Sequence, residues 1–285
     1  MTLAMLPGMA SAALVTTGLS QAASAAALPA MNMELVVVAS EVETGPRQLP
    51  ASLGEDASTK RVQAALNAKV PSAIAVDGGF GNVTRATFSK WQAKLGYTGL
   101  AANGIPGFTS LTKLGEGRYT LDHPIRVGAK ITYANCATRS CTVNTRTRNM
   151  LVAADGRVSW SIKVVKGSHD SSGNGSAGTH DGGGAVDITV SGMTQTRKWQ
   201  TVQALRTVGF AAWYRTNAQF PNEGEHIHAI AIGDTDMHTD AAAQVADYFN
   251  NINGLCCASR GADNQPDPYD NVLFTWWEVY HRAHP

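Results

Sequence analysis

Two segments of the chain carry the side chains best suited to chemistry. The first begins at His180 and ends at Asp187 after a run of glycines, and the second contains Glu225, His226 and His228. A zinc ion in a catalytic site takes three protein ligands of the His, Asp or Glu type and leaves a fourth position to water. His180, Asp187 and His228 supply this set, and Glu225 and His226 remain for proton transfer. The pairing therefore predicts a zinc-dependent hydrolase.

Strand alternation predicts how these side chains are directed. If the run after the glycines is a strand, Asp187 lies on the face opposite its apolar neighbours and is presented to a site. In a strand that begins at His226, the side chains of His226 and His228 share a face, whereas Glu225 points away unless it lies on the loop before the strand. Either segment alone is a weak signal, because most His-x-His pairs are ordinary core or surface histidines. Taken together, the two segments are far more specific.

The residues upstream favour helices and a repeated turn. Apolar residues recur at helical spacing from Ser58 onward and again over 83–95. Between and after these helices lie two similar turns, Asp77-Gly78-Gly79-Phe80-Gly81 and Asn103-Gly104-Ile105-Pro106-Gly107. Asp or Asn followed by Gly is typical of a tight turn with positive φ, and Thr84 or Ser110 could cap the helix that follows.

This part of the chain, over about residues 58–116, resembles the peptidoglycan-binding domain 1 family. The shared positions are Val62-Gln63, Leu66, Asp77-Gly78, Phe80-Gly81, Thr84, Phe88, Trp91-Gln92, Gly96, Asn103-Gly104, Gly107 and Leu111. Asn103 departs from the family, in which Asp is commoner at this place, but it keeps the turn chemistry. The resemblance implies a small three-helix module that binds peptidoglycan.

From about Thr120 the pattern changes to strands with a few helices. Runs rich in Val, Ile, Trp and Tyr predict strands at 131–133, 150–152, 158–165, 186–190, 210–214 and 226–232. Helical spacing predicts helices at 194–208 and 241–249. The fold class expected for the chain is therefore α+β, with a small helical module followed by an α+β domain over 120–255.

The site segments resemble the zinc D-Ala-D-Ala carboxypeptidases and dipeptidases of the lysostaphin/D-Ala-D-Ala peptidase/hedgehog fold group. The shared pattern, within about residues 145–235, is His180-x-x-Gly183-x-Ala185-x-Asp187 followed by His226-x-His228. Gly178 departs from the family, which has Ser two residues before the first His. The resemblance implies a central antiparallel sheet and a Zn²⁺ ion held by His180, Asp187 and His228. It also implies a catalytic role for His226, as in one branch of the family, or for Glu225, as in another.

The substrate-binding residues are less well indicated. Members of this family hold the substrate carboxylate with an upstream arginine, but no arginine lies between Arg157 and the site here. Lys163 or Lys166 would have to take this role. Each of them is more often simply a solvated lysine on a strand.

The ends of the chain and its composition bound the cellular setting. Residues 1–27 resemble a signal peptide, because they lack charged residues and end in small ones, and its cleavage would leave no stable membrane insertion. Residues 28–57 are expected to be a linker and 256–285 a tail. A net charge of +1 without a long basic run argues against nucleic acid as a partner. In an exported chain Cys136 and Cys141 could pair locally, or either could pair with Cys256 or Cys257.

These patterns together predict a secreted, monomeric bacterial cell-wall enzyme. A wall-binding module would tether a zinc D-Ala-D-Ala-type carboxypeptidase to peptidoglycan and raise its local substrate concentration. Two alternatives stay open. One is a zinc endopeptidase that cuts wall cross-bridges, and the other is a non-catalytic wall-binding protein whose zinc is structural.

Overall fold

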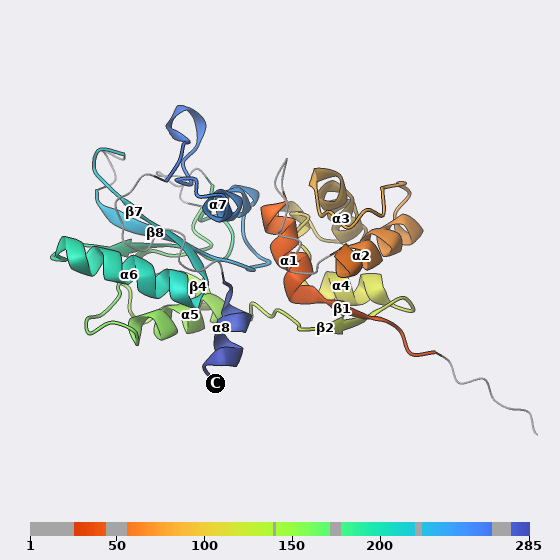
Figure 1. Ribbon diagram of the computed structural model, residues 1–285, viewed down its shortest axis with the longest axis horizontal. Helices are drawn as coiled ribbons and strands as arrows, with labels where there is room; N and C mark the ends of the chain where they lie inside the picture. The colour runs from red at the N-terminus through yellow and green to blue at the C-terminus, as the bar shows by residue number, and fades with distance from the viewer. Residues whose placement is uncertain (1–25, 44–55, 139–140, 172–177, 220–223, 264–274) are drawn as a thin grey trace, which may run out of the picture.

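The computed structural model describes residues 26–43, 56–138, 141–171, 178–219, 224–263 and 275–285 (Figure 1). Within these ranges helices and sheets are mixed, so the protein is α+β, as the sequence predicts. Every helix in these ranges is too short or too polar to span a lipid bilayer. Most of the signal-like segment, residues 1–25, lies outside the described residues.

A four-stranded sheet forms the centre of the C-terminal half. Its strands are β5 (Val164–Lys166), β6 (Ala185–Thr189), β7 (Phe210–Arg215) and β8 (His226–Ala231). They lie in the spatial order β5-β6-β8-β7, and every neighbouring pair is antiparallel. The register places Asp187 opposite His228 and Thr189 opposite His226. The predicted central antiparallel sheet is confirmed.

The two faces of this sheet differ in character. Three helices pack near it, namely α5 (Thr145–Asp155), α6 (Gln195–Val208) and α7 (Thr239–Phe249). On one face Ile188 and Ile227 join an apolar core that α5 and α6 complete. The opposite face carries Asp187 and His228, with α7 beside it. Because side chains alternate along a strand, the register that buries Ile188 and Ile227 on one face also places Asp187 and His228 on the other.

The N-terminal half is mainly helical. Its elements after residue 55 are α2 (Asp56–Lys69), α3 (Asn82–Lys94), the 3₁₀ turn η2 (Gly99–Ala102) and α4 (Phe108–Gly115). α2 contacts both α3 and α4. Val62, Leu66 and Phe88 are fully buried, so the predicted helices present the predicted apolar stripes to the core.

The two similar turns are each held by a glutamine of the preceding helix. Gln63 accepts a hydrogen bond from the Gly78 N–H (2.9 Å) and donates one to Asp77 Oδ1 (2.8 Å). Gln92 accepts in the same way from the Gly104 N–H (2.7 Å). Gly78 and Gly104 both have positive φ, at 96° and 82°, as the sequence predicts.

The hydroxyl groups after these turns do not cap the helices. The N-cap residues of α3 and α4 are Gly81 and Gly107, and neither cap has a side-chain hydrogen bond. The Thr84 hydroxyl instead donates back to the Gly79 carbonyl (3.4 Å), and that of Ser110 to the Gly107 carbonyl (2.9 Å). The capping prediction is wrong because each helix begins before its hydroxyl residue, which places that residue in the first turn.

A buried helix replaces part of the predicted linker. β1 (Ala30–Asn32) pairs in parallel with β2 (Thr120–Asp122), and α1 (Met33–Val42) follows β1. α1 lies between α2 and α7 (Figure 1), and Val36, Val37 and Val38 have no exposed surface. A helix that is apolar around most of its circumference is stable only where it is covered on several sides. The linker prediction is therefore wrong for residues 30–42.

Two strand predictions fail in the segment after Asn144. Residues 150–152 belong to α5, and within 158–165 only the last two residues, from Val164 onward, are in a strand. The Asn144 side chain caps α5 by accepting from the Thr147 N–H (2.8 Å). A short apolar run is compatible with a buried helix as well as with a strand. Here the Asn144 cap, which starts a helix just before the run, favours the helix.

The cysteines divide into a bridged pair and a free pair. β3 (Lys130–Thr132) and β4 (Thr142–Asn144) form a small antiparallel sheet, and a disulfide joins Cys136 to Cys141 in the connection between them. Cys256 and Cys257 are free and exposed, with Cys257 opening the 3₁₀ turn η3 (Cys257–Ser259). The local pairing is thus the one that forms.

The described end of the chain packs back on the molecule. It forms α8 (Trp277–Ala283), which is preceded by the buried Trp276. Glu278 pairs with Arg146 (2.7 Å), and Arg282 pairs with Glu34 of α1. These contacts connect α8 to both halves of the chain.

Candidate metal centre

His180, Asp187 and His228 lie together on the polar face of the sheet. His180 precedes the glycine run that leads into β6, whereas Asp187 and His228 are opposite residues of β6 and β8. His180 Nε2 is 3.2 Å from Asp187 Oδ2, and His228 Nδ1 is 2.8 Å from Asp187 Oδ1. One ligand atom from each of the three lies within 4.8 Å of the others, so this group could bind a metal ion. The structure thus brings together the three predicted ligands.

In both histidines, the ring nitrogen that points away from Asp187 already has a hydrogen-bond partner. His180 Nδ1 lies 2.9 Å from the Gly167 carbonyl, which can only accept, so Nδ1 carries the proton. His228 Nε2 lies 2.9 Å from Gln244 Oε1. The Gln244 amide donates to the Gly254 carbonyl (2.7 Å), which fixes its oxygen toward His228. In each neutral ring the remaining nitrogen therefore presents its lone pair to Asp187.

Three electron-pair donors thus converge without a hydrogen-bond donor among them. Such a set is stable only if a proton or a metal cation lies between its members. Burial alone would raise the pKa of Asp187, but the charge and hydrogen bonds of the two imidazoles, when a ring carries the intervening proton, hold it well below its ordinary value. Burial lowers the pKa of His228, whereas the Asp187 charge outweighs burial at His180 and raises the pKa there. The carboxylate is therefore ionised and faces two imidazoles.

The glycine run lets the loop before β6 approach its neighbour closely. A Cβ on Gly182 would lie 2.5 Å from the Asp236 carbonyl oxygen, and one on Gly183 would lie 2.7 Å from Asp234 Oδ1. Gly184 has a φ of 83°, in the region that favours glycine. The run is therefore required by packing, and it sets where His180 enters the cluster.

The two residues predicted for proton transfer have different surroundings. His226 Nε2 lies 3.9 Å from Asp187 Oδ1, and its Nδ1 lies 3.0 Å from the Gly224 carbonyl. The carboxylate of Glu225 pairs instead with Lys198 of α6 (2.7 Å). Hydrogen bonds from Lys198 and Tyr214 lower the pKa of Glu225. Because Tyr214 and α6 belong to the apolar face, Glu225 is held away from the cluster.

The two lysines predicted for substrate binding also separate. Lys166 is opposite Asp187 in the pairing of β5 with β6, and its charge acts to lower the pKa of His180. Lys163 is exposed and precedes β5. Of the pair, only Lys166 is within electrostatic reach of the cluster in this arrangement.

Two residues beside the cluster were missed by sequence reasoning. Gln244 comes from α7, where it interrupts a mainly apolar run, and that interruption was the available signal. Arg215 is opposite His226 on β7 and is only 2% exposed. Burial lowers its pKa to about 10, and it donates to the Asn253 carbonyl (2.6 Å). Its alternation with Trp213 along β7 could have placed it on this face.

The donor set agrees with the chemistry of zinc. Two imidazole nitrogens and one carboxylate oxygen are a set of three protein ligands that a catalytic Zn²⁺ ion would accept, with a fourth position left to water. Comparison of the chain with protein-family models, curated proteins and solved structures gives no match.

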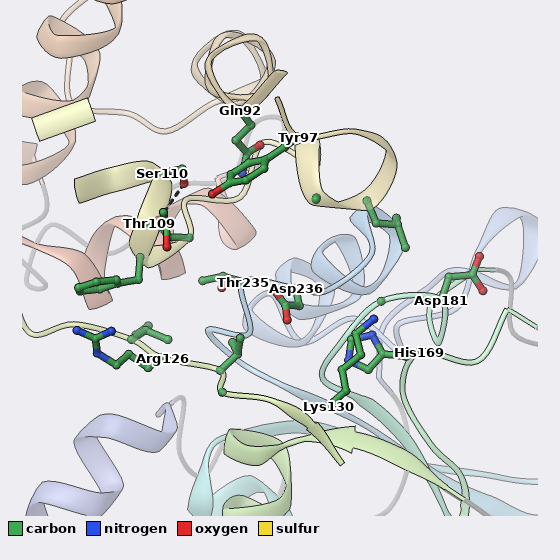
Figure 2. A pocket seen from close by; sticks show the side chains of 18 residues that line it. Gln92, Tyr97, Thr109, Ser110, Arg126, Lys130, His169, Asp181, Thr235 and Asp236 are labelled. Atoms are coloured by element: carbon green, nitrogen blue, oxygen red, sulfur yellow. Dashed lines mark hydrogen bonds between the residues drawn. The ribbon is translucent and has the colours of Figure 1, made fainter. Parts of the chain in front are cut away.

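A cavity of about 590 Å³ lies between the two halves (Figure 2). Tyr97 and Phe108 line it from the helical half, and Lys130, His169 and Asp236 line it from the other. Burial, together with the charge of Asp234, raises the pKa of Asp236 to about 6. Nε2 of His169 is buried there and has no hydrogen-bond partner among the described residues. Asp181 and Gly182, which directly follow His180, also line the cavity, so one loop borders both features.

Proposed function

We propose that this protein is a zinc-dependent peptidase that hydrolyses stem peptides of bacterial peptidoglycan, most specifically a D-Ala-D-Ala-type carboxypeptidase. The observation that carries the proposal is that His180 Nε2 and His228 Nδ1 lie 3.2 Å and 2.8 Å from the Asp187 carboxylate, in a group whose ligand atoms could hold one metal ion. A zinc ion bound there would acidify a water molecule and polarise the scissile carbonyl. Three protein ligands leave the position that such chemistry needs.

His226 is the residue proposed to move the proton. Its Nδ1 faces the Gly224 carbonyl and is the protonated nitrogen, so Nε2 presents a lone pair on the cluster side. From there Nε2 can take a proton from the attacking water and later deliver it to the leaving amine. Glu225 is the weaker candidate because Lys198 and Tyr214 already hold its carboxylate.

Peptidoglycan as substrate is supported by the two resemblances and by the helical half. The repeated turns that carry the wall-binding resemblance have matching hydrogen bonds, from Gly78 to Gln63 and from Gly104 to Gln92. The cavity of about 590 Å³ offers a wall fragment contacts with both halves at once. A secreted, wall-bound location belongs to the same proposal.

The proposal is tested by hydrolysis of purified muropeptides with and without a chelator. We expect zinc-dependent release of a terminal D-Ala from a pentapeptide stem, and loss of that release in His180→Ala. Products that retain the terminal residue but lose a cross-bridge would identify an endopeptidase on the same site. Full activity in the chelated protein or in His180→Ala would refute the assignment.

A second measurement separates the candidate proton carriers. His226→Gln should lower kcat strongly with little change in zinc content, because His226 lies beside the ligand set. Glu225→Gln is the matched control on the neighbouring residue and should retain most of the activity. The opposite ranking would identify Glu225 as the base and would require its ion pair with Lys198 to open.

One observation favours a structural metal as the second candidate. His180 and His228 are only 1% and 6% exposed, and buried ligands are typical of ions that hold a fold together. A wall-binding protein with a structural zinc would lose folding stability on chelation and show no turnover of any muropeptide. A stable metal-free fold together with zinc-dependent turnover would exclude it.

A further inference from the structure

Cys256 and Cys257 form a pair of exposed free thiols at the tip of a loop. The base of the loop is closed by a bridge between Ile252 and Ala262. At the tip the Cys257 thiol donates to the Cys256 sulfur, and the two sulfur atoms are 2.9 Å apart. The pair is therefore accessible to reagents and already in contact.

The same loop supports the metal cluster from behind. The Gly254 carbonyl, two residues before Cys256, accepts from the Gln244 amide (2.7 Å). Gln244 Oε1 in turn accepts from His228 Nε2 (2.9 Å). Only two hydrogen bonds thus separate the loop backbone from a metal ligand.

We propose that Cys256 and Cys257 are a redox-sensitive modification site, in which a reversible vicinal disulfide weakens the hold of the cluster on its metal ion. The inference rests on the metal-binding part of the proposed function. It does not depend on which bond the enzyme cuts. Such a site would couple metal loading to the thiol–disulfide balance of the surroundings.

The bond would form by exchange with a low-molecular-weight disulfide. The Cys256 thiolate attacks one sulfur of the reagent, which gives a mixed disulfide and releases one small thiolate. Cys257 then loses its proton and attacks the Cys256 sulfur, which releases the second small thiolate. Two protein thiols are oxidised to one disulfide while the reagent disulfide is reduced to two thiols that take up both protons.

Closing this bond must shift the loop backbone. Neighbouring Cα atoms are about 3.8 Å apart across a trans peptide, whereas disulfides usually join Cα atoms about 4.4–6.8 Å apart. Cys136 and Cys141 meet that range at 5.7 Å. The Cα of Gly254 packs closely against the Trp213 ring, because a Cβ there would lie 2.9 Å from it. With the Cα held in place, a shift of the loop turns the following peptide group, which moves the Gly254 carbonyl that accepts from Gln244.

The experiment compares zinc affinity and thiol content in the reduced and oxidised full-length protein. After treatment with oxidised glutathione, we expect the peptide that contains both cysteines to lose the mass of two hydrogen atoms. We expect zinc affinity to fall by about tenfold, at the lower end of the range seen when the hydrogen-bond partner of a metal ligand is disturbed. Reduction should restore both values.

The double variant Cys256→Ser/Cys257→Ser is the matched control. It should bind zinc as the reduced protein does and should not respond to glutathione. Interchain dimers, a stable glutathione adduct, or equal zinc affinity in the two states would overturn the proposal. Weaker zinc binding in the double variant would also overturn it, because the thiols would then be ligands. If no zinc binds in either state, the proposed function fails, whereas the mass change still reports whether the vicinal disulfide forms.

Discussion

Two polar clusters lie inside this protein, one on the sheet around Asp187 and one around Glu41 where α1 meets the loop after β8. In the first, two imidazole nitrogens and a carboxylate face one another, and each is an electron-pair donor. In the second, the buried Glu41 accepts from the Gly233 N–H (2.9 Å) and lies within electrostatic reach of Arg85 and Arg146.

The difference between the clusters is in how their charges are balanced. Around Glu41 the protein itself supplies the partners of the carboxyl group, namely the Gly233 N–H and the charges of Arg85 and Arg146. Around Asp187 the atoms that converge are all acceptors, and the balancing charge must come from a proton or a metal ion. Burial alone does not indicate a functional site, whereas convergent acceptors indicate a cation site.

The largest effect is expected from removal of the shared carboxylate. Asp187→Ala should abolish stoichiometric zinc binding, because it removes the ligand that both imidazoles face. The measurement is zinc content after dialysis, with circular dichroism to confirm that the variant is folded. Asp240→Ala, at a side chain that is 59% exposed, is the control and should retain zinc. Retained zinc in the Asp187 variant would remove the distinction between the clusters.

The cluster around Glu41 should affect stability and not metal binding. Burial raises the pKa of Glu41 from 4.5 to about 8. A raised pKa in the folded state means that its contribution is fully present below about pH 4.5 and is lost as pH rises through about 8. The loss should be on the order of 3–5 kcal/mol in the free energy of unfolding.

Denaturant unfolding across this pH window tests the effect. Glu41→Gln should remove most of the dependence and leave zinc binding intact, since Gln stays neutral. Glu116→Gln, at a side chain that is 57% exposed, should leave the dependence unchanged. An unaltered pH profile in Glu41→Gln would show that the carboxylate is not held neutral.

A smaller effect is expected from the partner behind His228. Gln244→Ala should weaken zinc binding by roughly 10–100-fold, because His228 Nε2 loses the acceptor that orients the ring. Gln244→Glu should recover part of the loss, since its carboxylate can still accept from His228. Gln200→Ala on the exposed side of α6 is the control. Equal affinities in all three variants would show that the ring orientation does not depend on Gln244.

The smallest change concerns the pH at which zinc is lost. A proton on His180 competes with the metal, and Asp187 raises the pKa of His180 above 6.5. As the solution is acidified, zinc affinity should therefore begin to fall while the pH is still above 6.5. Below the pKa of His180 the affinity should fall by about tenfold per pH unit, because one proton competes with the metal.

Lys166 provides the variant for this last measurement. Its charge acts to lower the pKa of His180, so Lys166→Met should move the onset of zinc loss to higher pH. Lys163→Met, at the exposed lysine, should leave the onset unchanged. A shift in the opposite direction would mean that the two groups do not interact as their charges require.

Local pattern was sufficient for much of the fold. Helices α2, α3, α6 and α7 and strands β6, β7 and β8 lie close to where the periodicity predicts them. Where prediction failed, the local signal was ambiguous. The apolar run over 35–38 lies within the predicted linker, yet it belongs to the helix α1, which α2 and α7 cover. The run over 150–152 is equally compatible with a helix, and the Asn144 cap decided for α5.

The sequence by itself determined the candidate ligand set, because the types and spacing of His180, Asp187 and His228 are local facts and strand alternation directs the side chains. It also determined the positive-φ turns at Gly78 and Gly104. Only the tertiary structure decided that Gln244 and the Gly167 carbonyl hold the outer ring nitrogens, that Lys198 draws Glu225 away, and that Glu41 is buried. Those outcomes depend on which elements pack against which, and contacts between residues distant in the chain leave no periodic trace in it.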